Sequence, residues 1–284
     1  MVTVLHASDL QCGRPYVARA GEALVRFARA LSPDLIVVAG DLTQRAKVRE
    51  FKAARALFDR FPRVPLVVTP GNHDVPLYRL WERVVTPYRN WRRLVSQALD
   101  TVTSAPGITV VALNSSAPRR AIVGGRIDTA QIDFAMAAFA AAPADDIRAL
   151  VVHHHLVVTP GGEGGRPLPT SRVLARAIEE MGVEFVLGGH VHQTHIRTTS
   201  EVVGEQGRSG VPLIACGTSA SRRGRGPEEG LNSLNVVRVS GDAIEVTPHL
   251  LAAESDDFEP RDSVRFSRRC IPSDLRLAAR GRGG

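Results

Sequence analysis

The chain has few cysteines, few aromatic residues and no long apolar run. Its three cysteines, Cys12, Cys216 and Cys270, are too sparse and odd in number for a disulfide framework, which favours a reducing compartment and predicts a cytoplasmic location. The most apolar stretch, residues 134–144, has about half of the roughly 20 residues needed to span a bilayer. The first residues also lack a charged start followed by an apolar segment. We therefore predict neither a transmembrane segment nor a signal peptide.

The remaining composition fits a folded, basic protein. The 284 residues are 44% hydrophobic and 23% charged, enough for one large domain or two small ones with a substantial core. There are 36 Lys and Arg against 29 Asp and Glu, a formal net charge of +7. This balance fits a partner or substrate that carries phosphate, but it does not identify that partner.

Apolar, β-branched runs alternate with amphipathic stretches along most of the chain. This alternation predicts an α/β domain. The predicted strands are residues 2–8, 34–39, 65–69, 108–113, 149–152, 185–187 and 213–215, and the predicted helices are residues 16–31, 47–61, 128–142 and 171–181. Beyond residue 232, two strand-like runs, 233–239 and 243–247, flank Ser240-Gly241-Asp242 and predict a hairpin in a more antiparallel region.

The segment from residue 75 to residue 99 is predicted to be a helical cap. It holds Trp81, Trp91, Tyr78 and Tyr88, together with Arg79, Arg83, Arg89, Arg92 and Arg93. These aromatic rings could stack on a ligand, or they could simply anchor the cap to the core. The sequence favours neither role over the other.

Seven of the nine histidines fall in three short places that follow or lie near predicted strands. They are His73, the run His153, His154 and His155, and the cluster His190, His192 and His195. Asp9, Asp41 and Asn72 follow the first three predicted strands. Each of these residues alone has an ordinary explanation as a turn or capping residue. Together they offer oxygen and imidazole ligands at one sheet edge, a donor set that suits Mn, Fe, Zn, Ni or Co in a two-metal centre.

Five motifs make the sequence similar to a known family. They are Ser8-Asp9-Leu10-Gln11, Ala39-Gly40-Asp41, Gly71-Asn72-His73-Asp74, Val152-His153-His154 and Gly189-His190-Val191-His192. In order and approximate spacing they resemble the calcineurin-like metallophosphoesterases, and the likeness covers residues 2–247. Residues 217–220 and 232–239 also resemble the bacterial branch that contains cyclic-nucleotide and glycerophosphodiester phosphodiesterases.

The resemblance implies a fold and a domain division. The expected fold is a four-layer α/β/β/α sandwich of two mixed sheets with a small helical cap inserted at about residues 75–105. The metallophosphoesterase domain would span residues 1–250, and residues 251–284 would form a C-terminal extension and basic tail.

The resemblance also implies two metal ions, divalent or trivalent, with a shared ligand. Asp41 would bridge them. Asp9, Gln11 and His192 would surround the first ion, and Asn72, His153 and His190 the second, with His154 an alternative to His153. Most family members have histidine where this chain has Gln11, and an amide oxygen is a weaker donor than imidazole for a transition metal. The first ion would therefore bind loosely or be a harder ion such as Mn, and a one-metal or degenerate site is also open.

The resemblance implies that a hydroxide bridging the two metals attacks the phosphorus of a phosphoester. His73 would donate a proton to the leaving group, and Asp74 would orient the His73 imidazole. Cys12 is not needed as a nucleophile.

The sequence leaves the substrate open. We favour a small phosphodiester or cyclic nucleotide. The alternatives are a pyrophosphohydrolase acting on a UDP-linked lipid precursor, and a non-enzymatic protein that binds nucleic acid or an anionic membrane surface. Exposed apolar side chains at Leu80, Val84, Val85 and Leu94 would favour the lipid, whereas inward arginines and stacked rings would favour the nucleotide.

Two further features concern the surface. The loop with Arg222, Arg223 and Arg225 could lie near the site, although a solvated charged loop is the more common case. Exposed aromatic residues of the cap would also permit a homodimer.

Overall fold

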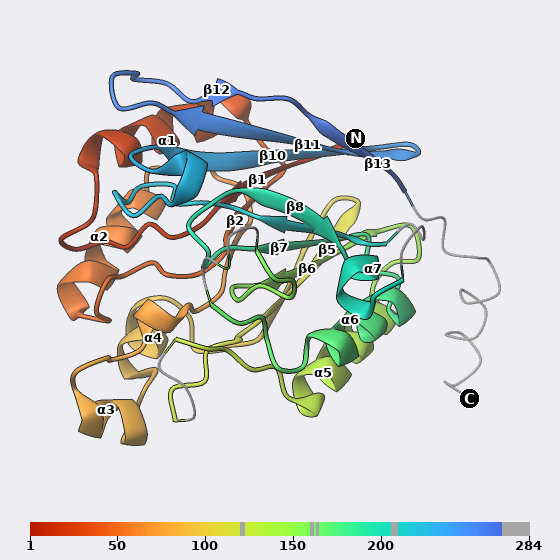
Figure 1. The fold of residues 1–284 in the computed structure, drawn as a ribbon, viewed down its shortest axis with the longest axis horizontal. Helices are drawn as coiled ribbons and strands as arrows, with labels where there is room; N and C mark the ends of the chain where they lie inside the picture. The colour runs from red at the N-terminus through yellow and green to blue at the C-terminus, as the bar shows by residue number, and fades with distance from the viewer. Residues whose placement is uncertain (120–122, 160–161, 163–164, 206–209, 269–284) are drawn as a thin grey trace.

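A computed structural model describes residues 1–119, 123–159, 162, 165–205 and 210–268. The chain forms two mixed β-sheets that pack face to face and carry helices on their outer faces (Figure 1). This is the four-layer α/β/β/α arrangement expected from the sequence. All of the strands and helices predicted above are present, with shifts of a few residues at their ends.

The first sheet has the order β12-β11-β10-β1-β2-β3, and β13 also pairs with β11. Its strands are β1 (Val2–Ala7), β2 (Leu35–Val38), β3 (Leu66–Val68), β10 (Asn232–Ser240), β11 (Ala243–Leu251), β12 (Glu259–Pro260) and β13 (Val264–Ser267). β1, β2 and β3 are parallel, and β10 runs antiparallel to β1. The carboxyl ends of the three parallel strands therefore meet at one edge.

The second sheet has the order β4-β5-β6-β7-β9-β8. Its strands are β4 (Thr101–Ala105), β5 (Ile108–Leu113), β6 (Ile147–Val152), β7 (Phe185–Gly188), β8 (His195–Thr198) and β9 (Pro212–Ala215). β5, β6, β7 and β9 are parallel, whereas the outer strands β4 and β8 are antiparallel to their neighbours.

The described helices are α1 (Ala18–Leu31), α2 (Val48–Phe58), α3 (Leu80–Val85), α4 (Arg89–Leu94), α5 (Thr129–Ala141), α6 (Ser171–Glu180) and α7 (Thr199–Val203), with 3-10 turns at Asn72–Asp74 and Gly226–Glu228. Helices α1 and α2 lie on the opposite side of the molecule from α5 and α6 (Figure 1). Within the described residues, no helix is both long enough and apolar enough to cross a membrane.

Alternation along the strands explains the layers. In β2, Leu35 and Val37 face the second sheet, whereas Ile36 and Val38 face α1 and α2. Because both faces of such strands are buried, they appear in the sequence as continuous apolar runs rather than as alternating polar and apolar residues. The central strands are thereby held rigidly, and so are the residues that follow them.

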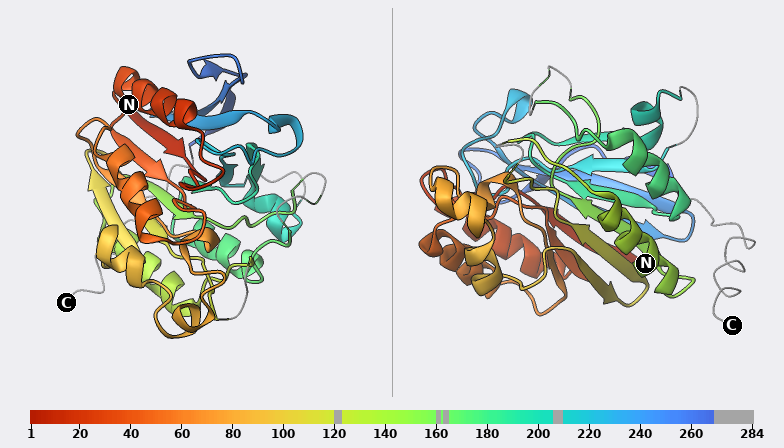
Figure 2. Two further views of the ribbon diagram at one scale, coloured as in Figure 1. Left: turned by 90° about the vertical axis from the view of Figure 1, so that its left-hand side faces the viewer. Right: turned by 90° about the horizontal axis from the view of Figure 1, so that it is seen from below.

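The cap is shorter than expected. Residues 101–105 form β4 of the second sheet, so the helical part is α3 and α4, and Figure 2 shows α4 beside α2. Trp91 is buried and its ring meets that of Phe51 edge-on, with centroids 6.2 Å apart. Trp91 therefore anchors α4 to the core and is not available to stack on a ligand.

The chain beyond residue 250 returns to the first sheet. Glu259–Pro260 and Val264–Ser267 both pair with β11, so residues up to 267 share the same sheet as β1. Most of the expected basic tail lies outside the described residues.

Candidate metal centre

The polar residues singled out in the sequence lie at the carboxyl ends of neighbouring strands. Five of the seven candidate ligands adopt an unusual backbone conformation with a positive φ angle: Asp9 (52°), Gln11 (46°), Asp41 (50°), His190 (76°) and His192 (61°). Side chains other than glycine rarely adopt this left-handed conformation, and such strain concentrates at functional sites. The strained turns aim these side chains at a common point.

Two glycines of the motifs are required by close approach at this site. A Cβ atom on Gly71 would lie 2.1 Å from Asp41 Oδ1, and one on Gly189 would lie 1.9 Å from Ser8 Oγ. Neither distance is compatible with a larger residue unless the site moves. The glycines therefore allow the loops after β3 and β7 to pack directly against the acidic residues after β1 and β2.

Asp9, Asp41 and His153 converge within the buried part of the site. One ligand atom from each lies within 4.8 Å of the others. His153 Nε2 is 3.5 Å from Asp41 Oδ1. Asp9 Oδ1, Asp41 Oδ2 and His153 Nε2 are all buried without a hydrogen-bond partner. Buried polar atoms are nearly always paired, so three that converge fit a cation between them.

The local electrostatics also favour a cation at this point. Burial by itself would lower the pKa of His153, but the Asp41 and Asp9 carboxylates raise it to about 9. Burial likewise opposes ionisation of Asp41, yet His153 and His73 hold the pKa of that carboxyl well below its usual range. The two carboxylates thus remain ionised and stabilise positive charge between them.

Neighbouring carbonyl groups orient two of the imidazoles. His153 Nδ1 donates to the Ala39 carbonyl at 2.6 Å, which leaves Nε2 directed at Asp41. His192 Nδ1 donates to the Arg223 carbonyl at 3.0 Å, and its Nε2 lies 3.1 Å from Asp9 Oδ1. A backbone carbonyl on one ring nitrogen is the usual device that fixes the other nitrogen toward a metal.

His154 has a different environment. Its Nδ1 lies 2.7 Å from the Ser115 hydroxyl, and its Nε2 donates to the Val123 carbonyl at 3.0 Å. Burial holds the pKa of His154 well below its usual value, so the ring is neutral. Both nitrogens are occupied away from Asp9 and Asp41, and the geometry therefore favours His153 over His154 as a ligand.

Asn72 and His190 lie together on the other side of the site. Asn72 Oδ1 is 3.0 Å from His190 Nδ1. The His190 ring stacks on His155, with centroids 5.5 Å apart and an interplanar angle of 19°. His155 therefore supports the His190 ring, while His195 contacts the Gln193 carbonyl.

Gln11 is buried in the site, and its amide oxygen is held by a hydrogen bond. Oε1 accepts a hydrogen bond from Ser221 Oγ at 3.1 Å, with Arg223 Nη1 at 3.5 Å, while Nε2 lies 3.1 Å from His192 Nε2. In this orientation the side chain presents its amide nitrogen to His192, and its oxygen is bonded to Ser221.

His73 borders the same site. Its Nδ1 donates to the Gln44 carbonyl at 3.0 Å, and its Nε2 lies 3.1 Å from Arg223 Nη1 and 4.0 Å from Asp41 Oδ2. The backbone N–H of His73 also donates to Asp41 Oδ1 at 2.8 Å. His73 thus helps to fix the central carboxylate and exposes one ring nitrogen to the pocket.

Asp74 does not orient the His73 imidazole, which corrects the expectation from the sequence. Its carboxylate accepts hydrogen bonds from the backbone N–H groups of Leu42, Thr43 and Gly71 and from the Thr43 hydroxyl. Burial, and then the neighbouring Asp41, raise the pKa of Asp74 to about 7. The carboxyl therefore braces the loop after β2 against the loop after β3.

Three arginines surround the open side of the site. Arg45, Arg223 and Arg225 line a cavity of about 400 Å³ together with Asp41, Asn72, His73, His190 and His192. The arginine-rich loop was noted in the sequence, and Arg223 and Arg225 do reach the site. Arg45 was not among the residues singled out in the sequence, where its only local signal is its place four residues after Asp41.

Cys12 lies near this site but is not equipped as a nucleophile. Its side chain is buried, and burial raises the pKa of its thiol to about 12. The reactive thiolate is therefore scarce at neutral pH.

Comparisons with solved structures show the same fold at low sequence identity. Purple acid phosphatase PPD1 from yellow lupin has a TM-score of 0.72 and 13% identity, over 96% of this chain and 55% of the lupin chain. A dimetal phosphatase from Danio rerio has a TM-score of 0.65 and 12% identity, over 94% of this chain and 99% of the fish chain. GAP50, the anchor in the inner membrane complex of Plasmodium, has a TM-score of 0.62 and 12% identity, over 98% and 94% of the two chains.

This chain thus spans little more than half the length of the lupin phosphatase. No curated protein matches the sequence. The model of the calcineurin-like phosphoesterase family matches residues 2–194, which contain the five motifs and every candidate ligand. Membership of that family supports metal-dependent phosphoester hydrolysis and implies a dinuclear site. On this match and on the four-layer fold, the chain belongs to the calcineurin-like phosphoesterase family.

Proposed function

We propose that this protein is a dinuclear phosphodiesterase that hydrolyses a small phosphodiester or a cyclic nucleotide. The observation that carries the proposal is the cavity of about 400 Å³ at the candidate metal centre, with Arg45, Arg223 and Arg225 on its walls. Its volume lies toward the lower end of the range of small-molecule sites, about 300–1,000 Å³. Arginine guanidinium groups match phosphate oxygens in charge and geometry.

The metal ligands we propose are Asp41 between the ions, Asp9, His192 and Gln11 at the first, and Asn72, His153 and His190 at the second. Two divalent cations held there would neutralise charge at the phosphate and would lower the pKa of a bound water to about 7. The orphaned atoms of Asp9, Asp41 and His153 fit such cations. For Gln11, binding through oxygen requires the amide to turn away from Ser221.

The residues of the chain would act on the phosphoester from the open side. Arg223 would bind a phosphate oxygen, and that contact would draw its guanidinium away from His73 Nε2, 3.1 Å away. His73 would then be free to hold the proton that the leaving oxygen takes, while the Gln44 carbonyl keeps its ring in place.

The first test is hydrolysis of bis(p-nitrophenyl) phosphate against p-nitrophenyl phosphate by metal-depleted protein refilled with Mn, Ni, Co, Zn or Fe. Metal content is measured in the same samples. We expect metal-dependent turnover with a preference for the diester, followed by activity on cyclic nucleotides or glycerophosphodiesters. Preference for the monoester, or absence of diester turnover by fully loaded protein, would overturn the diesterase assignment.

Two variants separate binding from proton transfer. Arg223→Gln should raise KM about tenfold or more, because a charge-assisted contact to phosphate is lost. Arg222→Gln is the matched control, since Arg222 is exposed and does not line the cavity.

His73→Ala should lower kcat about a hundredfold while metal content is unchanged. A His73→Ala protein that is fully active, or that has lost its metal, would exclude the proton-transfer role.

A second candidate is pyrophosphate hydrolysis on a UDP-linked lipid precursor. The observation that favours it is the exposure of Leu80, Val84 and Val85 on α3, whereas Leu94 packs against the core. Trp91, one of the rings that could have stacked on a nucleotide, is buried. The test is the same metal-loaded protein with a UDP-linked acyl sugar, compared with the deacylated UDP-sugar. A large preference for the acylated compound would select this candidate.

A further inference from the structure

The short helix α3 and the residue pair before it form an exposed apolar surface. Tyr78, Leu80 and Trp81 are 75%, 69% and 80% exposed, and Val84 and Val85 are also largely exposed. We call these five residues the α3 face. Exposed large apolar residues that occur singly are ordinary, but a cluster with a tryptophan and a tyrosine marks an interaction site.

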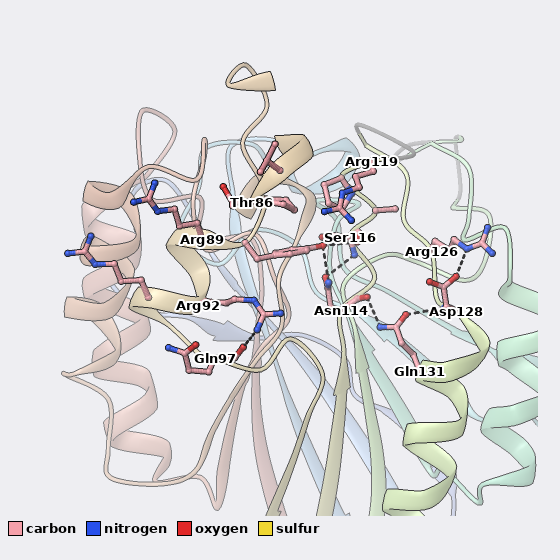
Figure 3. A pocket seen from close by; sticks show the side chains of 16 residues that line it. Thr86, Arg89, Arg92, Gln97, Asn114, Ser116, Arg119, Arg126, Asp128 and Gln131 are labelled. Atoms are coloured by element: carbon pink, nitrogen blue, oxygen red, sulfur yellow. Dashed lines mark hydrogen bonds and ion pairs between the residues drawn. The ribbon is translucent and has the colours of Figure 1, made fainter. Parts of the chain in front are cut away.

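The α3 face adjoins a cavity whose charge is strongly positive. The cavity has a volume of about 920 Å³ and begins at Val85 and Thr86. Five arginines line it, from α4 and from the loop before α5: Arg89, Arg92, Arg93, Arg119 and Arg126. Figure 3 shows Arg92 on one side of this cavity and Arg119 and Arg126 on the other. We call it the cationic cavity.

Most of this positive charge is not neutralised by carboxylates. The one acidic residue on the cavity wall, Asp128, pairs with Arg126 at 2.5 Å. Arg92 and Arg119 donate to the backbone carbonyls of Gln97 and Val84 instead. Across the described residues, no carboxylate forms an ion pair with Arg89, Arg92, Arg93 or Arg119. The cavity therefore retains an attraction for anions.

We propose that the α3 face and the cationic cavity together dock this protein on the surface of an anionic phospholipid bilayer. Trp and Tyr are the side chains that favour the boundary between lipid head groups and acyl chains. Leu and Val add apolar area to be buried there, and arginines beside them bind lipid phosphates. The apolar cluster therefore matches the acyl-chain boundary of the bilayer, and the adjacent arginines match the lipid phosphates.

A second copy of this chain fits the same surface poorly. A twofold contact through the α3 face would bring the arginines of two cationic cavities close together, and that like-charge contact opposes association. The position of α3 also argues against a second copy of the chain. Helix α3 stands at a corner of the molecule (Figure 1). A corner can insert into a bilayer, whereas a stable protein interface needs a broad complementary surface.

Docking in this orientation would place the candidate metal centre beside the lipid surface. Arg45 lies over the Tyr78 ring, with its guanidinium carbon 5.2 Å from the ring centroid. Arg45 and Leu77 also line the cavity at the metal centre. The α3 face thus adjoins the rim of that cavity. Docking itself does not depend on which phosphoester is cleaved, because it needs neither the metals nor the substrate.

The test is flotation of the full chain with vesicles, without substrate. One set contains equal parts of phosphatidylglycerol and phosphatidylcholine, and the other contains phosphatidylcholine alone. We expect binding to the anionic vesicles that weakens as salt is added, because screening reduces the arginine contribution. Tryptophan fluorescence gives a second readout. The chain has two tryptophans, of which Trp91 is 1% exposed, so a shift to shorter wavelength on binding must come from Trp81.

Matched variants test the two parts of the surface separately. Trp81→Ser should weaken vesicle binding about tenfold, and Val173→Ser on α6 should leave it unchanged. Arg89→Gln combined with Arg93→Gln should weaken binding at least about tenfold. The control with the same charge change is Arg172→Gln combined with Arg176→Gln, both exposed on α6. All of these positions are at the surface, so the variants should fold, which circular dichroism checks.

Several outcomes would overturn the proposal. They are failure of the wild-type chain to float with anionic vesicles at low salt, equal loss of binding in the α6 controls, and a dimer in ultracentrifugation that Trp81→Ser dissociates. If the metal-loaded wild-type chain binds anionic vesicles but hydrolyses no phosphodiester, the proposed function is wrong and the docking surface is still supported.

Discussion

The two halves of the candidate metal centre differ in backbone conformation and in donors: Asp9, Gln11 and His192 all have positive φ angles, whereas only His190 does in the other half. In the half with Asn72, His153 and His190, the His153 Nε2 atom has no hydrogen-bond partner. In the half with Asp9, Gln11 and His192, the Gln11 amide nitrogen lies 3.1 Å from His192 Nε2. The half with Gln11 is therefore partly closed by an internal contact that a cation would have to displace. The difference suggests that the two metal sites are unequal in affinity, and that a single residue causes this.

Removal of the shared carboxylate should affect both halves of the metal centre equally. Asp41→Asn should lower phosphoesterase activity about a thousandfold or more, because both halves lose their common anionic ligand and several kcal/mol of charge stabilisation. Metal analysis of the purified variant should show loss from both halves. A variant that keeps two bound ions would contradict the bridging role of Asp41.

Removal of one imidazole should affect one half only. His153→Ala should lower activity about a hundredfold and remove one of two bound ions. His154→Ala is the matched control. It should keep its metal but lose about 1–3 kcal/mol of stability, because the Ser115 hydroxyl and Val123 carbonyl lose their partner. The opposite pattern of metal loss would assign the ligand to His154.

Restoring histidine at position 11 should make the two halves more alike. Gln11→His should raise the affinity of the weaker metal site about tenfold, since imidazole is the better donor for a transition metal. The position has a φ of 46°, a conformation that histidine tolerates better than most residues. Isothermal titration with Mn or Zn measures the effect, and Gln44→His controls for an added histidine nearby. An unchanged weak site would mean that Gln11 does not limit metal binding.

The smallest expected effect comes from the residue that holds the Gln11 oxygen. Ser221→Ala removes the hydrogen bond from Ser221 Oγ to Gln11 Oε1, which is 3.1 Å long. The amide can then turn its oxygen to a metal at lower cost, so affinity at the weaker site should rise about two- to tenfold. The tighter site should not change. A fall in affinity at the weaker site would show that the present orientation of Gln11 helps metal binding.

Much of the scaffold could be predicted from the sequence. The runs that became β1, β2 and β3 are apolar because both of their faces are buried, and the residues after them were recognised as polar exceptions. The cap was harder. Nothing local distinguishes Trp91, buried against Phe51, from Trp81, 80% exposed, because both lie in short arginine-rich stretches. Which one is covered depends on where α4 meets α2.

The α/β class follows from the alternation of strand-like and helix-like runs, and the layered fold and the donors at the site follow from the resemblance that the five motifs carry. Periodicity and short motifs are local properties, whereas the use of individual atoms depends on the folded chain. His153 and His154 are adjacent and identical in type, yet one faces Asp41 and the other bonds to Ser115 and Val123. Asp74 follows His73 directly, yet its carboxylate braces the loop after β2. These hydrogen-bond partners come from segments far apart in the chain, so they cannot be predicted from the local sequence.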